Sequence, residues 1–311
     1  MKPTQINYLD TFSILCYHGI CADEADFGEF NSSGKHISAS IFEDQIAHIA
    51  KNYTVVTMTE IGDLYLKGLP VPAQSVAVTF DDGFANNVSH AWPILEKYGV
   101  PATFYLTTGY VDTDRVMRMD VIEAVVFSSG LKKLEFEVED RFISLGLETA
   151  QSRKESFFEL KRFCKSLPQK LAEKMIESLL SVAPDPEIFR RSEYMFMTWD
   201  DARRMDQSEL IELGAHTVDH FPLSTLDDSQ VEFQVLSSLQ KIEEELNKRC
   251  THFAYPEGRL IDYDERTISL LIDKNITLAP NAVNGCNLCH SINPYHLNRV
   301  LVGMDGNSFP L

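Results

Sequence analysis

The chain has 311 residues, 44% of them hydrophobic, and it carries a formal net charge of −18 at pH 7. This length fits a single α/β barrel, and the hydrophobic content is too high for a disordered chain. The negative charge argues against nucleic acid or an anionic membrane surface as a binding partner.

The N-terminal residues predict the compartment. Residues 1–20, "MKPTQINYLDTFSILCYHGI", lack a signal-peptide pattern, because Asp10 precedes the apolar run and no small-residue cleavage site follows it. No apolar run approaches the ~20 residues of a transmembrane helix. The six cysteines are irregularly spaced, which is typical of reduced thiols. We therefore expect a cytoplasmic protein without a transmembrane segment.

Short apolar runs rich in β-forming residues recur along the chain, and we interpret them as strands. They cover residues 12–17, 53–58, 75–80, 102–106, 210–216, 252–256, 275–280 and 296–302. Their continuous apolar character predicts strands that are buried on both faces, as in a parallel sheet covered by helices.

Amphipathic patterns between several of these runs predict the helices. One covers residues 40–52 after a Ser40 cap, a second covers 89–99 and ends at Gly99, and the longest covers 228–249. The alternation of strands and helices predicts an α/β barrel.

Residues 112–198 differ in character, because they are rich in charges and in helical patterns. One alternating patch, "KKLEFEVEDRFISL" at residues 132–145, predicts a β-hairpin. We interpret this stretch as a long insertion between barrel units and not as an independent domain. The whole chain, residues 1–311, is then a single domain.

Polar residues follow the predicted strands at the ends where parallel barrels place their chemistry. Four strands contribute them: Tyr17 and His18, Asp81 and Asp82, His216 and His220, and Tyr255 with Glu257. This coincidence predicts a functional site at one end of the barrel.

The two aspartates alternate sides at the end of their strand, so they can take different roles. One can bind a metal ion while the other accepts a proton from water. The alternative is that "DDG" is only a turn that caps a helix.

The two histidines of "HTVDH" are four residues apart. A single helical turn would place both imidazoles on one face, where they could bind one metal ion. The alternative is a surface pair beside Asp219. For His18, the alternative to a catalytic role is a hydrogen-bonded residue in the core or at the barrel rim.

Four sequence motifs resemble those of the polysaccharide deacetylases, carbohydrate esterase family 4, in the branch with an F-A-Y-P-x-G third motif. They are "YHGI" (17–20), "TFDDG" (79–83), "HTVDH" (216–220) and "FAYPEG" (253–258). The resemblance runs from about residue 12 to about residue 302, with 112–198 as a variable insertion.

The resemblance implies a distorted (β/α) barrel with about seven parallel strands and a divalent metal ion, commonly Zn²⁺. Iron, cobalt or nickel would also suit one carboxylate and two histidines. By motif position, the implied metal ligands are Asp82, His216 and His220. Asp81 would be the general base, and a backbone N–H near Tyr255, within residues 255–257, would bind the oxyanion.

The motifs also depart from the family pattern. Glu257 stands where tyrosine is usual, and Ala254 lies near the place of an arginine found in another branch. The resemblance implies that Arg299 orients Asp81 instead. The C-terminal histidine motif has only poor matches, His290 and His296, which favours His18 as the general acid.

The resemblance predicts an enzyme that removes an N-acetyl group from an amino sugar. The expected cytoplasmic location favours a nucleotide- or lipid-linked intermediate of surface-polysaccharide biosynthesis as the substrate. Two alternatives stay open: a related amidohydrolase acting on a formyl amide or cyclic ureide, and a non-catalytic carbohydrate-binding protein with a degenerate site. Product analysis, acetate against formate or ureide cleavage, separates the enzymatic alternatives.

Overall fold

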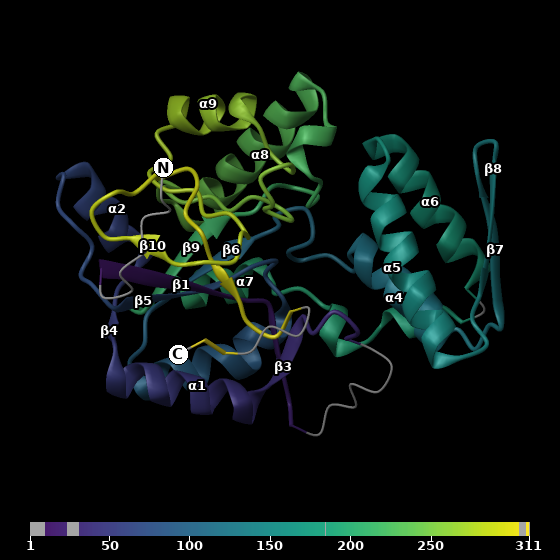
Figure 1. The fold of residues 1–311 in the computed structure, drawn as a ribbon, viewed down its shortest axis with the longest axis horizontal. Helices are drawn as coiled ribbons and strands as arrows, with labels where there is room; N and C mark the ends of the chain where they lie inside the picture. The colour runs from purple at the N-terminus through teal and green to yellow at the C-terminus, as the bar shows by residue number, and fades with distance from the viewer. Residues whose placement is uncertain (1–9, 24–30, 184, 305–308, 311) are drawn as a thin grey trace, which may run out of the picture.

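The computed structural model describes residues 10–23, 31–183, 185–304 and 309–310 (Figure 1). Residues 1–9, which enter the prediction that the chain lacks a signal peptide, lie outside the described residues. Among the helices that are described, none combines the length and the apolar character needed to cross a membrane.

Four parallel strands form the continuous part of the barrel. They pair in the order β1 (Thr11–Tyr17), β5 (Ser75–Phe80), β6 (Ala102–Leu106) and β9 (Ile211–Ala215). Every residue of β1, β5 and β6 is buried. This burial explains their continuous apolar sequences, because parallel strands are covered on both faces.

The barrel closes through isolated bridges and one short strand. All of them are parallel: Ala215↔Phe253, His252↔Leu278, Pro280↔Leu297, and β11 (Val300–Leu301) against β1. The structure is therefore the distorted (β/α) barrel with about seven parallel strands that the sequence predicts.

Several predicted strands are shorter than expected. Residues 252–256 and 275–280 form bridges only, and both runs end in a proline, which cannot donate a ladder hydrogen bond. The run 53–58 reduces to β4 (Thr54–Val55), because Thr57 already caps the next helix.

Three further short strands lie outside the insertion. β2 (Gly19–Cys21) and β3 (His36–Ser38) pair in parallel beside the barrel. β10 (Asn287–Leu288) pairs antiparallel with β1. The sequence runs did not predict these short strands.

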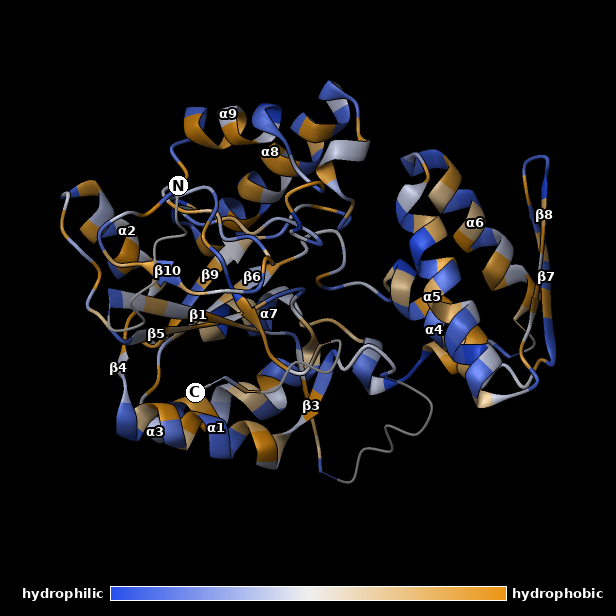
Figure 2. Ribbon diagram, viewed as in Figure 1, coloured by the Kyte–Doolittle hydropathy of each residue, from blue (hydrophilic) through white to orange (hydrophobic). Residues whose placement is uncertain are grey.

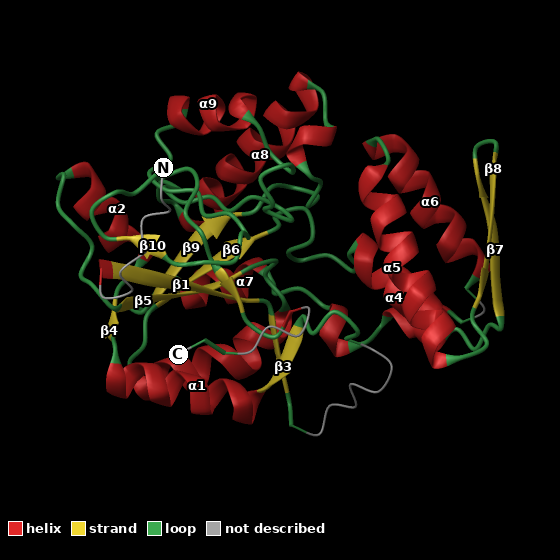
Figure 3. Cartoon of the chain, viewed as in Figure 1, coloured by secondary structure: helices red, strands yellow, loops and turns green. Residues whose placement is uncertain are grey.

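The helices cover the barrel, as Figure 3 shows with red helices around the yellow strands. Figure 2 shows that hydrophobic and hydrophilic residues alternate along the turns of these helices. They are α1 (Ala39–Asn52), α2 (Met58–Leu66), α3 (Trp92–Tyr98), α7 (Trp199–Met205), α8 (Asp228–Leu246) and α9 (Glu265–Asp273). A π-helical turn (Asn87–Ala91) precedes α3, and a 3-10 turn (Leu223–Thr225) precedes α8.

The helix caps correct one prediction and confirm another. Ser38, not Ser40, caps α1, because its side chain accepts the backbone N–H of Ile41 and Ser40 already lies in the first turn. Gly99 ends α3 in the left-handed conformation, with a φ of 62°. This region favours glycine, which explains the stop signal in the sequence.

The insertion packs as a group of three helices and a hairpin to one side of the barrel (Figure 1). It contains α4 (Arg118–Ser128), β7 (Lys133–Val138), β8 (Arg141–Gly146), α5 (Ala150–Ser166), α6 (Gln169–Val182) and two 3-10 turns (Pro186–Phe189 and Ser192–Tyr194). The predicted hairpin is present, and alternate residues of β7 are buried. Insertion and barrel residues belong to one hydrophobic core cluster. That the chain is a single domain stays a prediction.

Candidate metal centre

The carboxyl ends of three strands of the barrel bring the predicted site residues together. Asp81 and Asp82 follow β5, His18 follows β1, and His216 follows β9. The strands run parallel in the order β1-β5-β6-β9, with Tyr17 paired to Phe80 and Leu106 paired to Ala215, so the residues that follow lie at one edge. These four side chains, together with His220, line one cavity.

Three of these side chains converge as a metal-binding set would. Oδ1 of Asp82 lies 3.3 Å from Nε2 of His220 and 3.8 Å from Nε2 of His216. All three ligand atoms lie within 4.8 Å of one another. A tetrahedral zinc ion with bonds of about 2.0–2.1 Å separates its ligands by about 3.3 Å. The spacing therefore fits one divalent ion.

The hydrogen bonds around these residues also fit a metal ion. Nδ1 of His216 lies 2.8 Å from the carbonyl oxygen of Ala254. As the donor to this acceptor, Nδ1 carries the proton and leaves Nε2 with a lone pair that can bind a metal ion. Oδ1 of Asp82 is buried and accepts no hydrogen bond from any residue that the structure describes. A cation at this point would satisfy it.

Burial sets the protonation states of the set. It lowers the pKa of both His216 and His220, so both imidazoles are neutral, as metal ligands must be. Burial raises the pKa of Asp82, Lys35 lowers it, and the nearby Asp81 raises it further. A buried carboxylate in such surroundings becomes stable as an anion when a divalent cation binds it.

The local backbone differs from the predicted helical turn. Residues 216–220 form an irregular bend, with positive φ at Thr217 (66°) and His220 (58°). Asp82 also has a positive φ of 76°. Non-glycine residues in this region are strained, and such strain is concentrated at functional sites. The two imidazole rings meet all the same, with their centroids 4.9 Å apart.

Asp81 is held by Arg299, as the family resemblance implied. Nη1 of Arg299 donates to Oδ1 of Asp81 at 2.7 Å, and Nη2 donates to Oδ2 at 2.6 Å. Burial alone would raise the pKa of Asp81, but Arg299 holds it well below its usual range. Asp81 is therefore ionised, and its orientation is fixed by two hydrogen bonds.

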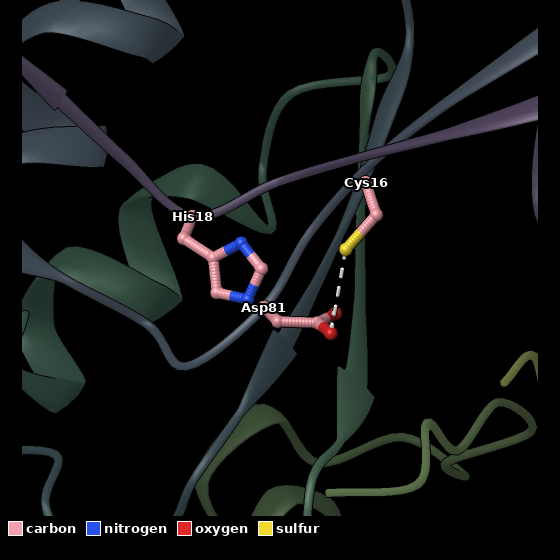
Figure 4. Close-up of side chains that lie close together, drawn as sticks. All are labelled: Cys16, His18 and Asp81. Carbon is pink, nitrogen blue, oxygen red and sulfur yellow. Dashed lines mark hydrogen bonds between the residues drawn. The ribbon is translucent and has the colours of Figure 1, made fainter. Parts of the chain in front are cut away.

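His18 lies beside Asp81, and Figure 4 shows its ring next to the carboxylate. Its nearer ring nitrogen is within 4.8 Å of an Asp81 oxygen, and its Nδ1 has no hydrogen-bond partner in the described part of the chain. Burial lowers the pKa of His18 to about 4, against the opposing effect of Asp81. His18 is thus neutral near pH 7.

Cys16 joins this group, and the motifs did not reveal it. Its thiol donates to Oδ2 of Asp81 at 3.5 Å (Figure 4). Cys16, His18 and Asp81 also lie close enough to bind a metal ion. Arg299 already occupies both carboxylate oxygens with a positive charge, and burial raises the pKa of the Cys16 thiol, so it stays protonated. A cation is therefore better placed at Asp82 than here.

The two C-terminal histidines do not reach the cavity. His290 is largely exposed and lies 3.1 Å from Asp10, and Nδ1 of His296 lies 2.7 Å from the Tyr263 hydroxyl. Among the described residues, neither contributes to the cavity wall.

The third motif contributes backbone groups. The Tyr255 hydroxyl donates to the carbonyl of Tyr295 at 3.2 Å, and its ring stacks on Tyr263. The backbone N–H of Tyr255 donates to Pro280, and Pro256 has no N–H. The N–H of Glu257 bonds to no other backbone group in the described ranges. Of residues 255–257, Glu257 therefore has the one N–H without a backbone partner among the described residues.

Several insertion residues line this cavity, and no sequence motif pointed to the two that hold groups of the third and "HTVDH" motifs. Lys165 of α5 forms an ion pair with Glu257. Arg118 of α4 donates to the carbonyl oxygens of Asp219 and His220 at 2.8 and 2.7 Å. These partners are separated by 92 to 102 positions in the sequence, so only the folded chain reveals them.

Comparison with known proteins identifies related sequences. A family profile described as "Polysaccharide deacetylase" matches residues 68–135 and 165–279, which is more than half of the chain. Poly-beta-1,6-N-acetyl-D-glucosamine N-deacetylase of Staphylococcus aureus strain MSSA476 is 30% identical over 155 residues, 45% of this chain and 52% of that protein. The protein of the same name from Escherichia coli K12 is 30% identical over 103 residues, 33% of this chain and 15% of that protein.

Solved structures share the fold. Streptococcus pyogenes deacetylase PplD, in complex with acetate, has a TM-score of 0.60 at 18% identity, covering 96% of this chain and 94% of that one. IcaB from Ammonifex degensii has a TM-score of 0.59 at 18% identity, covering 94% and 92%. The sequence match to the S. aureus protein spans about half of that protein's length.

Proposed function

The chain belongs to the polysaccharide deacetylase family, and we propose that it is a metal-dependent N-deacetylase of an N-acetylated amino sugar. One observation carries the proposal. Asp82, His216 and His220 converge within 4.8 Å beside an aspartate that is held by a buried arginine. A degenerate binding protein would not need both a ligand set and a fixed base.

These three ligands would hold one divalent ion, such as Zn²⁺, iron, cobalt or nickel. When bound, the ion would supply a Lewis acid for the acetamide carbonyl and would lower the pKa of a water molecule. Asp81, ionised and fixed by Arg299, takes the proton from the attacking water. The Glu257 N–H stabilises negative charge on the carbonyl oxygen.

The leaving amine needs a proton, and in this proposal His18 delivers it. Because the pKa of His18 is about 4, the resting imidazole is neutral and must first receive a proton. Asp81 lies beside it and holds the proton removed from water. The C–N bond breaks, the amine leaves with that proton, and the products are acetate and a free amino sugar.

Two substrate forms fit this proposal. The relatives' name, poly-beta-1,6-N-acetyl-D-glucosamine N-deacetylase, favours an N-acetylglucosamine unit in a β-1,6-linked glycan. The nucleotide- or lipid-linked amino sugar and the cytoplasmic location follow from the sequence prediction alone, and they stay part of the proposal.

The test is acetate release by the zinc-loaded protein from β-1,6-linked N-acetylglucosamine oligomers and from a nucleotide-linked N-acetyl amino sugar. We expect acetate from at least one substrate and none after Asp81→Asn. Formate release from an N-formyl sugar, or ureide cleavage without acetate, would support the alternative amidohydrolase. Metal binding without hydrolysis of any of these compounds would support a binding protein.

A further inference from the structure

The wall of the catalytic cavity comes from two parts of the chain. The barrel contributes the three proposed metal ligands and, in addition, His18 and Glu257. The insertion contributes side chains from α4 and α5: Arg118, Asp120, Glu123, Phe157, Lys161 and Lys165. A sugar that reaches the metal ligands therefore lies between the barrel and the insertion.

The ion pair between Lys165 and Glu257 joins these two walls directly. The side chains are only 18% and 16% exposed, so their charges are largely removed from water. Burial would raise the pKa of Glu257, but Lys165 lowers it to about 2. Separating such a pair leaves an uncompensated, poorly solvated charge, so the contact resists opening.

A second connection joins α4 to the segment before β3. Lys35 forms an ion pair with Asp120, and their side chains are 12% and 3% exposed. The backbone N–H of Ser32 donates to Oε1 of Glu123 at 3.0 Å. Lys35, Asp120 and Glu123 all line the cavity, so this connection also stands in its wall.

A third connection joins α4 to the "HTVDH" loop. Arg118 donates to the carbonyls of Asp219 and His220, and its guanidinium carbon lies 3.4 Å from the centre of the Phe221 ring. The insertion is therefore bound to the barrel at three separate places around the cavity.

Starting from the proposed deacetylase function, we propose that the insertion makes the site a pocket for a terminal or single N-acetylated amino-sugar unit. An internal unit of a polymer continues in two directions, through both of its glycosidic bonds, whereas a terminal unit continues in only one. The connections at Glu257, Asp120 and His220 stand in the cavity wall on the side of the insertion, so a second glycan arm could pass there only by breaking one of these contacts. Lys165 and its partner Glu257 thus determine specificity for chain ends.

The first experiment maps the product of the wild-type protein. A β-1,6-linked N-acetylglucosamine oligomer of defined length, about ten units, is incubated with the zinc-loaded enzyme, and the free amines are located by tandem mass spectrometry. We expect a plateau at about one acetate per chain, with the free amine at one terminus. Free amines spread through internal units would overturn the proposal while leaving the deacetylase function intact.

The second experiment opens the wall. Lys165→Ala is compared with Lys174→Ala, which removes an exposed ion pair of the same insertion at α6. We expect Lys165→Ala to raise kcat/KM for internal units relative to terminal units by about tenfold, and Lys174→Ala to leave the ratio unchanged. An unchanged ratio in Lys165→Ala, with the fold intact, would remove Lys165 from the proposed role. Absence of acetate from every substrate would instead refute the proposed function, and this inference with it.

Discussion

The barrel and the insertion contribute to the site in different ways. Barrel residues bring the reactive groups, and each pair lies within a few positions at the end of one strand, as with Asp81 and Asp82. The described insertion residues bond to none of the ligand atoms of the proposed metal site. Arg118 and Lys165 instead hold the backbone of His220 and the side chain of Glu257. The reactive groups thus come from short sequence motifs, whereas the geometry of the site depends on contacts between residues far apart in the sequence.

The difference between barrel and insertion would be contradicted most clearly if a reactive residue of the barrel could be replaced without loss of activity. Asp81→Asn keeps the shape of the side chain but removes the proton acceptor. We expect kcat to fall by about 10³–10⁴-fold with metal content unchanged, because Asp81 is not among the three converging ligands. Steady-state kinetics and elemental analysis of the same preparation measure both quantities.

His18→Ala tests the second proton-transfer group of the barrel. We expect a loss of about 10²–10³-fold in kcat, since an amide cannot release its amine without a proton. His296→Ala is the matched control, because His296 pairs with Tyr263 away from the cavity. Equal losses in the two variants would remove His18 from the mechanism.

Arg118 of the insertion should affect metal affinity more than the chemical step. In Arg118→Met, the strained backbone at His220 loses both guanidinium hydrogen bonds, and we expect metal to bind about tenfold more weakly. Titration of the metal-free protein with Co²⁺, followed by absorption spectroscopy, gives the Kd directly.

Arg115→Met is the control for that titration. Arg115 contacts the side chain of Asp219 in the same loop, but it is about half exposed, so its loss should change the Kd less. If Arg118→Met bound Co²⁺ as tightly as the wild type does, the insertion would have no part in holding the ligand loop.

The smallest effect concerns stability and pH. The pKa of Glu257 is about 2 in the folded protein, below its ordinary value of about 4.3 in an unfolded chain. The Lys165 pair therefore stabilises the fold fully above about pH 4.3, and this stabilisation is lost as the pH falls toward 2. We expect Lys165→Met to lower the free energy of unfolding by about 3 kcal/mol at pH 7.

Urea unfolding of wild type and Lys165→Met at pH 7 and pH 3 measures this difference. The gap between the two proteins should narrow at pH 3, where part of the pair's contribution is lost. A gap that stays constant with pH would mean that Lys165 stabilises the fold through packing alone.

Strand-end residues could be predicted from the sequence because local patterns determine their positions. A buried strand that stops at Asp81 or His216 must place these side chains at the barrel edge, and parallel pairing then brings them together. The contact of Arg299 with Asp81 followed from the family resemblance. It could not follow from spacing, because 218 positions separate the two residues.

Other features depend on contacts that a single sequence does not display. The loop of His216 and His220 is bent rather than helical, because Thr217 and His220 take left-handed conformations. Tertiary hydrogen bonds hold both residues, from the Thr108 N–H to the Thr217 carbonyl and from Arg118 to the His220 carbonyl. In the sequence, Cys16 looks like an ordinary strand residue, and its contact with Asp81 appears only in the folded chain. Lys165 lies among other charged residues of an amphipathic helix, and nothing in that pattern singles it out.

The most direct test of the metal centre is elemental analysis of the purified wild-type protein beside His220→Ala. If Asp82, His216 and His220 hold one ion, the wild type contains about one divalent metal ion per chain and His220→Ala loses it. If neither protein binds metal after reconstitution with zinc, cobalt or nickel, the three side chains are not a metal centre. The proposed deacetylase mechanism would then be wrong.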